Sequence, residues 1–298
     1  MKAGGENDIL LSQGEARLRV ARLGAEALGW SVGGVELLWP GDPAIWGEIS
    51  PILFPVVGWT RDGARVGGQR FDLGLHGFAR RLTFEVEVQH ADFVRLVVRD
   101  DAATRALYPF AFALAAEYRL TADALEIALE VKNGADTAMP YACGLHPGFN
   151  WPFAGASRAG ARVRFAAAER GEVPVIAPGG LVSPETRPIP LQDGTTLALD
   201  EALFAREALC FLDAASRSLR FEQADGSALE MALDNFPHIA LWSRPAAPFL
   251  SLEAWTGFGD PVNFSGDLFE KPSMRVLAPG AGARHVATYR YIPAGSVA

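Results

Sequence analysis

The first residue whose type and setting could support chemistry is His146. It lies in the stretch Tyr141-Ala-Cys-Gly-Leu-His-Pro-Gly-Phe-Asn-Trp-Pro-Phe153. Pro147 favours an extended backbone at His146, and Gly148 and Pro152 disfavour a helix after it. The sequence therefore predicts that the imidazole ends a strand and begins a loop, a common location for catalytic residues. A catalytic histidine and a buried core histidine fit this stretch equally well.

A second candidate is Glu253, within the predicted strand Phe249–Trp255. Strand alternation places Leu250, Leu252 and Ala254 on one face and Ser251, Glu253 and Trp255 on the other. If the leucine face belongs to the core, Glu253 lies beside the indole of Trp255. Such a pair suits sugar binding, because the indole covers an apolar sugar face while the carboxylate accepts hydroxyl groups. An ordinary outward-facing glutamate fits this strand about as well.

Other kinds of site find less support. His76 lies between Gly74 and Gly77, which predicts an exposed loop tip where a solvated histidine is at least as probable as a functional one. No His-x-His or His-Glu-x-x-His spacing indicates a metal site. Cys143 lies three residues before His146, so the two side chains of an extended strand point to opposite faces, and Cys143 is predicted to be in the core. Phosphate-loop and dinucleotide motifs do not occur, so we expect no metal and no cofactor.

Composition narrows the class of partner. Hydrophobic residues make up 49% and charged residues 21% of the 298 residues, typical of a globular protein. The net charge of −8 disfavours nucleic acid and anionic membranes as partners, so a small neutral ligand is the expected partner. We expect a monomer or homodimer. No apolar run reaches about 18 residues and no leader pattern is present. Two cysteines, Cys143 and Cys210, are expected to be free thiols in the cytoplasm.

Period-two alternation indicates the fold class. In Leu125–Lys132, for example, apolar and charged residues alternate, which predicts a strand with one buried and one solvated face. Similar segments recur along the chain, and 3.6-residue periodicity is scarce, with one plausible short helix over 200–209. The region 174–193 is rich in proline and glycine and is predicted to be a long loop. We predict an all-β fold, a large antiparallel β-sandwich, in which residues 1–298 form a single domain.

Four motifs together suggest a family. They are Pro51-Ile-Leu-Phe-Pro-Val-Val-Gly58, Leu75-His-Gly-Phe-Ala-Arg80, Leu145-His-Pro-Gly-Phe-Asn150 and Leu252-Glu-Ala-Trp-Thr-Gly-Phe-Gly-Asp260. In this order they resemble the aldose 1-epimerase (galactose mutarotase) family, most closely its bacterial LacX-like branch. The resemblance runs from about Ile52 to Gly280, and the family fold is a galactose mutarotase-like supersandwich.

The resemblance implies that Glu253 is the general base, His146 the general acid and His76 a second histidine that holds the sugar. We also expect Asn150 and Trp255 among the substrate-binding residues. Acid-base catalysis of anomer interconversion requires an ionised Glu253 and a protonated His146 near neutrality. A neighbouring negative charge would favour the protonated form of His146.

Three positions depart from the family pattern. Trp59 stands where the branch has an arginine, so Arg61 or Arg80 replaces that arginine, or Trp59 stacks on the sugar instead. Gly148 occupies the place of a common aromatic residue. Ala254 occupies the place of a common proline.

Three functions follow in order of preference. The first is an aldose 1-epimerase that interconverts the anomers of a free aldose such as galactose or glucose. The second is a hexose-6-phosphate 1-epimerase, which would need a convergent arginine cluster for the phosphate from Arg61, Arg65, Arg80 and Arg81. The third is a non-catalytic sugar-binding β-sandwich protein.

Overall fold

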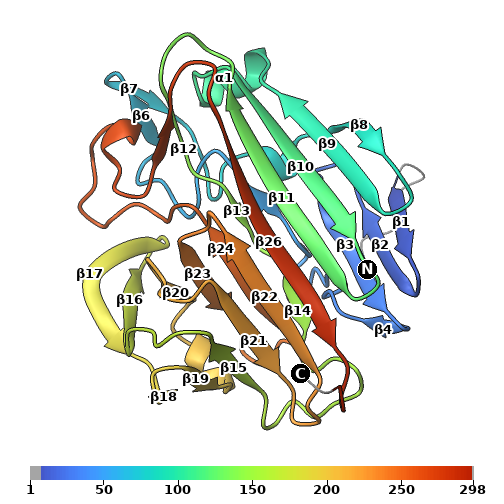
Figure 1. The fold of residues 1–298 in the computed structure, drawn as a ribbon. Helices are drawn as coiled ribbons and strands as arrows, with labels where there is room; N and C mark the ends of the chain where they lie inside the picture. Colours follow the sequence, from blue (N-terminus) through green and yellow to red (C-terminus); the bar gives the residue numbers. More distant parts are fainter. Residues whose placement is uncertain (1–7, 297–298) are drawn as a thin grey trace.

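Ten antiparallel strands form the largest sheet of the protein (Figure 1). The computed structural model describes residues 8–296. In spatial order the strands are β18 (Leu191–Gln192), β19 (Thr196–Ala198), β15 (Arg162–Phe165), β21 (Ser218–Glu222), β22 (Ala228–Asp234), β26 (Gly282–Ile292), β11 (Ala124–Asn133), β10 (Phe112–Leu120), β9 (Phe93–Arg99) and β8 (Glu85–Gln89). The alternation predicted for residues 125–132 is seen in β11, where Leu125, Ile127, Leu129 and Val131 are buried.

A six-stranded sheet packs against this sheet and carries most of the motifs. Its strands are β20 (Leu209–Phe211), β23 (His238–Trp242), β24 (Phe249–Trp255), β13 (Gly144–Leu145) and β5 (Ile52–Leu53), with β14 (Gly148–Asn150) also paired to β24. The Tyr289 hydroxyl of β26 donates a hydrogen bond of 3.1 Å to the Leu252 carbonyl of β24. Every residue of β24 is buried, so this strand lies at the centre of the molecule.

A four-stranded sheet near the N-terminus lies beside the large sheet. It consists of β1 (Ile9–Gln13), β2 (Ala16–Val20), β3 (Ala27–Val32) and β4 (Val35–Glu36). The Tyr118 hydroxyl of β10 donates to the Ala25 carbonyl and joins the two layers. One continuous hydrophobic core includes residues from all three sheets. The predicted all-β antiparallel sandwich is therefore confirmed.

Small elements complete the fold. The two-stranded pairs are β6 (Ala64–Val66) with β7 (Gln69–Phe71), β12 (Met139–Tyr141) with β25 (Arg275–Leu277), and β16 (Glu172–Ala177) with β17 (Leu181–Pro188). The helices are α1 (Ala102–Leu107) and the 3-10 turns η1 (Ala79–Arg81), η2 (Glu201–Phe204) and η3 (Leu268–Glu270). Within residues 8–296, none of these helices has the length and apolar character needed to cross a membrane.

Two local predictions need correction. The region 174–193 is not one long loop, because most of it belongs to the hairpin β16–β17. Prolines are tolerated there since a two-stranded hairpin has open edges, and the pairing is irregular between Pro174 and Ile176. The helix expected over 200–209 is only the short turn η2, whose first turn is capped by the Asp200 side chain.

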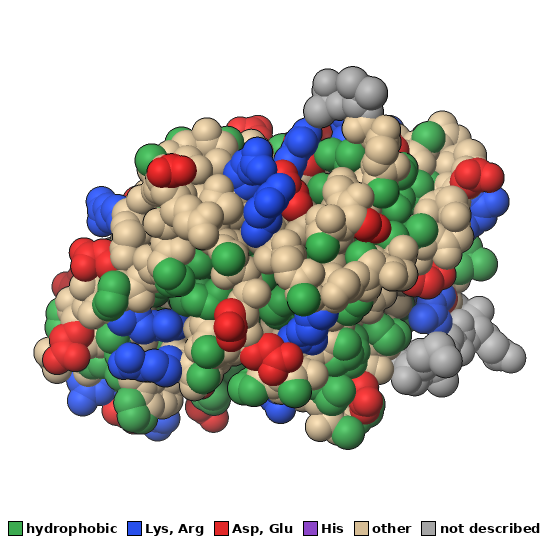
Figure 2. All heavy atoms as spheres, turned by 90° about the horizontal axis from the view of Figure 1, so that it is seen from below, with side chains coloured by type: hydrophobic (Ala, Val, Ile, Leu, Met, Phe, Trp, Pro, Cys, Tyr) green, Lys and Arg blue, Asp and Glu red, His purple; other side chains and the backbone are tan. Residues whose placement is uncertain are grey.

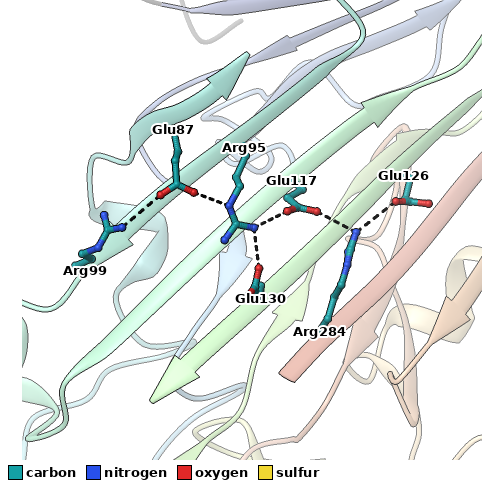
Figure 3. A network of polar contacts seen from close by, with 7 residues as sticks. All are labelled: Glu87, Arg95, Arg99, Glu117, Glu126, Glu130 and Arg284. Atoms are coloured by element: carbon teal, nitrogen blue, oxygen red, sulfur yellow. Dashed lines mark hydrogen bonds and ion pairs between the residues drawn. The ribbon is translucent and has the colours of Figure 1, made fainter. Parts of the chain in front are cut away.

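Charged side chains of both signs lie at the surface. On the face shown in Figure 2, acidic and basic groups are interspersed with hydrophobic ones. On the large sheet, Arg95 of β9 contacts Glu87, Glu117 and Glu130 of three other strands at 2.7, 2.5 and 2.7 Å (Figure 3). Partial burial lowers the pKa of the Arg95 guanidinium, but its hydrogen bonds to the three glutamates outweigh this effect and raise the pKa.

Arg95→Met is expected to destabilise the protein by about 1 kcal/mol, because three carboxylates lose their shared cation. The matched control is Arg290→Met, since within residues 8–296 Arg290 forms a single ion pair, with Asp123 at 3.6 Å, and both side chains are more than half exposed. Thermal unfolding at low and high salt measures the effect, which should shrink as salt screens the charges. Equal destabilisation by both substitutions would contradict the network's contribution.

Candidate active site

The pairing of β13, β14 and β24 brings His146 to Glu253. Leu145 pairs with Ala254 and Gly148 with Ser251, so the same register places His146 directly opposite Glu253. Cross-strand neighbours on one face lie in contact. His146 follows a strand end as predicted, but no loop begins there, because the chain pairs with β24 again from Gly148.

The two side chains meet inside the protein. His146 Nε2 lies 3.3 Å from Glu253 Oε2, and the side chains are 12% and 1% exposed. The Trp255 indole Nε1 donates a hydrogen bond of 3.0 Å to the same carboxylate oxygen. The leucine face of β24 is in the core, so Glu253 lies beside an indole on the opposite face.

Burial shifts the pKa of each member of this pair. Desolvation raises the pKa of the Glu253 carboxyl well above its usual value, although the hydrogen bond from the Trp255 indole opposes the shift. Desolvation also lowers the pKa of His146 to about 3. Both directions oppose an ionised Glu253 and a protonated His146 as separate charges. The direct contact allows the pair to hold one proton together, on either partner.

His76 approaches the pair from the loop after β7. Its ring centre lies 5.7 Å from that of His146. The Gly58 backbone N–H donates a hydrogen bond of 3.0 Å to His76 Nδ1, so the neutral ring carries its proton on Nε2. Desolvation, together with the positive charges of His146 and Arg80, lowers the pKa of His76 well below its usual value. His76 thus lies against the Gly58 backbone and near the His146 ring, whereas the sequence also allowed a solvated loop histidine.

These groups line one cavity of about 270 Å³. Four tryptophans contribute to its walls: Trp46, Trp59, Trp242 and Trp255. The Trp46 ring centre lies 5.1 Å and that of Trp242 5.5 Å from the centre of the His146 ring. A small pocket with aromatic walls and a few polar groups is the form that a site for a small ligand commonly takes.

Trp46 and Trp242 were not predicted. For Trp242 a signal existed, because alternation along β23 and its pairing with Ser251 place it on the Glu253 face. Trp46 lies outside any strand, and no periodicity marks it. Its position explains Gly148, where a side chain would come within 2.8 Å of Trp46 Cζ3. The indole therefore leaves no room for the aromatic residue expected at that position.

Two glycines, Gly58 and Gly180, leave the space that the Trp59 indole needs to reach the cavity. Gly58 has φ of +74°, and a Cβ there would lie 2.6 Å from Gly259 Cα, so only glycine permits this approach. The Gly180 Cα lies against the indole, because a Cβ on Gly180 would overlap Trp59 Cδ1. Trp59 remains 41% exposed and lines the rim of the cavity.

Of the remaining predicted binding residues, Arg80 lines this cavity and Arg61 and Asn150 do not. Arg80 lines the cavity, and its guanidinium is engaged by Glu48 at 3.1 Å and by the Leu75 carbonyl at 3.0 Å. Arg61 is exposed and does not line the cavity. Asn150 lies elsewhere, because its amide donates to the Glu36 carbonyl and it borders a cavity of about 870 Å³ beside the N-terminal sheet. That larger cavity lacks the acid-base pair.

The other chemical groups found nearby are a thiol and two charged side chains. Cys210, a free buried cysteine, lines the cavity, and desolvation raises its pKa to about 12. Glu207 and Arg244 lie at the same cavity and were not singled out from the sequence, since neither belongs to a recognisable motif. Within residues 8–296, no three His, Cys, Asp or Glu side chains are grouped as metal ligands would be.

Comparisons with known proteins show which family the chain resembles over most of its length. The family model described as aldose 1-epimerase matches residues 7–289. The chain is 30% identical over 257 residues to the chromosomal protein LacX of Lactococcus lactis subsp. lactis. The aligned region covers 83% of this chain and 86% of LacX.

Two solved structures are also similar to the whole chain. A galactose mutarotase related enzyme from Lactobacillus acidophilus superimposes with a TM-score of 0.88 at 26% identity, covering 96% of this chain and 98% of the other. A galactose mutarotase-like protein from Lactobacillus casei superimposes with a TM-score of 0.89 at 24% identity. The match covers 96% of this chain and 100% of the other.

Proposed function

The chain belongs to the aldose 1-epimerase family, and we propose that it interconverts the α and β anomers of a free aldose by acid-base ring opening. The observation that carries the proposal is the 3.3 Å contact between His146 Nε2 and Glu253 Oε2 in a cavity of monosaccharide size. A base and an acid so close together can act on two oxygens attached to the same carbon atom, which are the hydroxyl and ring oxygens of an anomeric centre.

In the forward step, Glu253 takes the proton of the C1 hydroxyl while His146 Nε2 donates a proton to the ring oxygen. The C1–O5 bond breaks as the C1–O1 bond becomes a carbonyl, so the product is the open-chain aldehyde. Rotation about C1–C2 presents the other carbonyl face. Ring closure then reverses both proton transfers and yields the other anomer.

The proton count of the pair explains why both groups are buried together. Before ring opening the shared proton is on His146, and afterwards a proton is on Glu253, so the pair carries no net charge at either stage. Burial disfavours either charge alone, whereas the ion pair at 3.3 Å is partly compensated. A cavity that excludes water also strengthens the electrostatic interactions within it.

Sugar binding is assigned to the groups around the pair. His76 Nε2–H can donate a hydrogen bond to a sugar oxygen, because Gly58 occupies its other nitrogen. The indoles of Trp46, Trp242 and Trp255 offer apolar surfaces near the reacting carbon. Trp59, in place of the family arginine, covers the rim of the site with an aromatic face.

A free sugar is the preferred substrate over a hexose 6-phosphate. Of the four arginines that would have formed a phosphate grip, only Arg80 lines the cavity, and its guanidinium already pairs with Glu48. Polarimetry of freshly dissolved α-glucose and α-galactose, with glucose 6-phosphate in parallel, tests this choice. We expect faster mutarotation of a free hexose; acceleration of the phosphate ester alone would favour the phosphate-specific alternative. Sugar binding in calorimetry without any acceleration would indicate a non-catalytic protein.

The pH dependence should reflect the shared proton. Because desolvation lowers the pKa of His146 to about 3, the pair gains a second proton only in strong acid. Because burial raises the pKa of Glu253, loss of the shared proton is displaced upward. We therefore expect kcat/KM, corrected for the uncatalysed rate, to stay level on lowering the pH through about 6.5. Initial rates across this range check the prediction, and a fall with midpoint near 6.5 would show that His146 titrates as an ordinary exposed histidine.

A further inference from the structure

The hydroxyl of Ser251 contacts His146 at Nδ1, the ring nitrogen that does not face Glu253. Ser251 is fully buried on β24, two residues before Glu253 and on the same face. Its Oγ is 3.0 Å from His146 Nδ1 and donates a hydrogen bond of 2.9 Å to the Pro147 carbonyl. Ser251 does not line the cavity, so a bound sugar would meet His146 but not this hydroxyl.

The direction of these hydrogen bonds determines which nitrogen of His146 carries the proton. A serine hydroxyl has one hydrogen and a carbonyl can only accept, so the hydrogen of Ser251 is used at Pro147. The Ser251 oxygen is then an acceptor for His146, and Nδ1 must be the donor. Nε2, which faces Glu253, is left free to take up or release a proton.

This arrangement agrees with both positions of the shared proton. When the proton is on Glu253, Nε2 accepts it in a hydrogen bond; when the proton is on His146, Nε2 donates to Glu253. Nδ1 keeps its hydrogen and its bond to Ser251 in either case. With the opposite tautomer, a neutral His146 would carry its hydrogen on Nε2, which could not accept a proton from Glu253.

His76 provides an internal contrast. A backbone N–H donates to its Nδ1, so its proton is held on Nε2, the reverse of His146. The same side-chain type therefore has two forms in one cavity, each selected by one hydrogen bond at Nδ1. One ring is a fixed donor and the other can exchange a proton.

We propose that Ser251 is a positioning residue that holds His146 in the Nδ1–H tautomer and thereby keeps Nε2 available for proton exchange with Glu253 and the sugar ring oxygen. The inference rests on the proposed function for its catalytic meaning. Its structural part, the tautomer of His146, can be measured without turnover.

The first test is long-range ¹H–¹⁵N NMR of the five histidine side chains at neutral pH, with the His146 signals assigned by their loss in His146→Gln. We expect His146 to show a protonated Nδ1 and an unprotonated Nε2, and His76 to show the reverse. A predominantly Nε2-protonated His146 would overturn the proposal, whether or not the protein catalyses mutarotation.

The second test is Ser251→Ala, which should lower kcat by about 10–100-fold with little change in KM, as is typical when a group orienting a functional histidine is lost. Ser251→Thr, which retains a hydroxyl, should recover most of the activity if it folds. The matched control is Ser243→Ala, because Ser243 is also a buried serine in this sheet region but bonds only to the Arg244 and Phe249 carbonyls. Full kcat and an unchanged His146 tautomer in Ser251→Ala would overturn the proposal.

Discussion

Glu253→Gln is expected to lower kcat for mutarotation by about 10²–10⁴-fold, the range contributed by general acid-base groups. Glutamine has nearly the same shape, and its amide oxygen can still accept the hydrogen bond from Trp255 Nε1. It cannot take the proton of the C1 hydroxyl. The rate should therefore fall while sugar affinity and the unfolding temperature change little.

A matched control separates this effect from a general effect of removing a carboxylate. Glu201→Gln changes a half-exposed glutamate of η2, whose side chain contacts Arg158 and lies outside the cavity. The control should retain full activity. Anomer interconversion by Glu253→Gln at the unmodified rate would show that another group is the base.

His146→Gln is expected to cause a loss similar to that of Glu253→Gln, about 10²–10⁴-fold in kcat, because the ring oxygen loses its proton donor. In the proposed mechanism the two residues exchange one proton, so they should act as a unit. The double variant should then be little slower than either single variant, as is found for catalytic groups that work together. Rates for the wild-type protein and the three variants form a double-mutant cycle.

The outcome of this cycle is informative in either direction. Strongly non-additive losses support a coupled pair across the 3.3 Å contact. Losses that multiply would indicate that the two side chains contribute independently and would contradict the shared proton. Circular dichroism of each variant shows whether a loss of activity comes from unfolding.

Strand alternation allowed much of the site to be predicted from sequence. The leucine face of β24 is in the core, so Glu253 and Trp255 share the opposite face as expected. The position of His146 opposite Glu253 depends on strand register, which is set by pairing between segments about 100 residues apart. A sequence pattern of period two identifies faces but does not give this register.

Residues outside regular strands could not be placed in the same way. Trp46 reaches His146 from an irregular segment, and Arg61 does not line the cavity although it lies close to Trp59 in sequence. Asn150 lies only four residues after His146 yet borders a different cavity, because the chain moves along β14 away from the pair. Tertiary packing determines these positions, and no local periodicity encodes it.

The protonation of the pair also depends on the assembled structure. The need for an ionised Glu253 and a protonated His146 follows from the chemistry, but burial shifts the pKa of each group in the opposite direction. Sequence reasoning contains no measure of desolvation at these atoms. The contact between the two side chains resolves the difficulty, because one proton can be shared without a net charge.

Magnetisation-transfer NMR at anomeric equilibrium tests the central claim most directly, since it detects exchange between the α and β H1 signals of a free hexose without any net reaction. We predict that the wild-type protein produces exchange between these signals for glucose or galactose and that Glu253→Gln at the same concentration does not. Exchange that is equally fast with both proteins, or absent with the wild-type protein while the sugar binds, would contradict acid-base ring opening by His146 and Glu253.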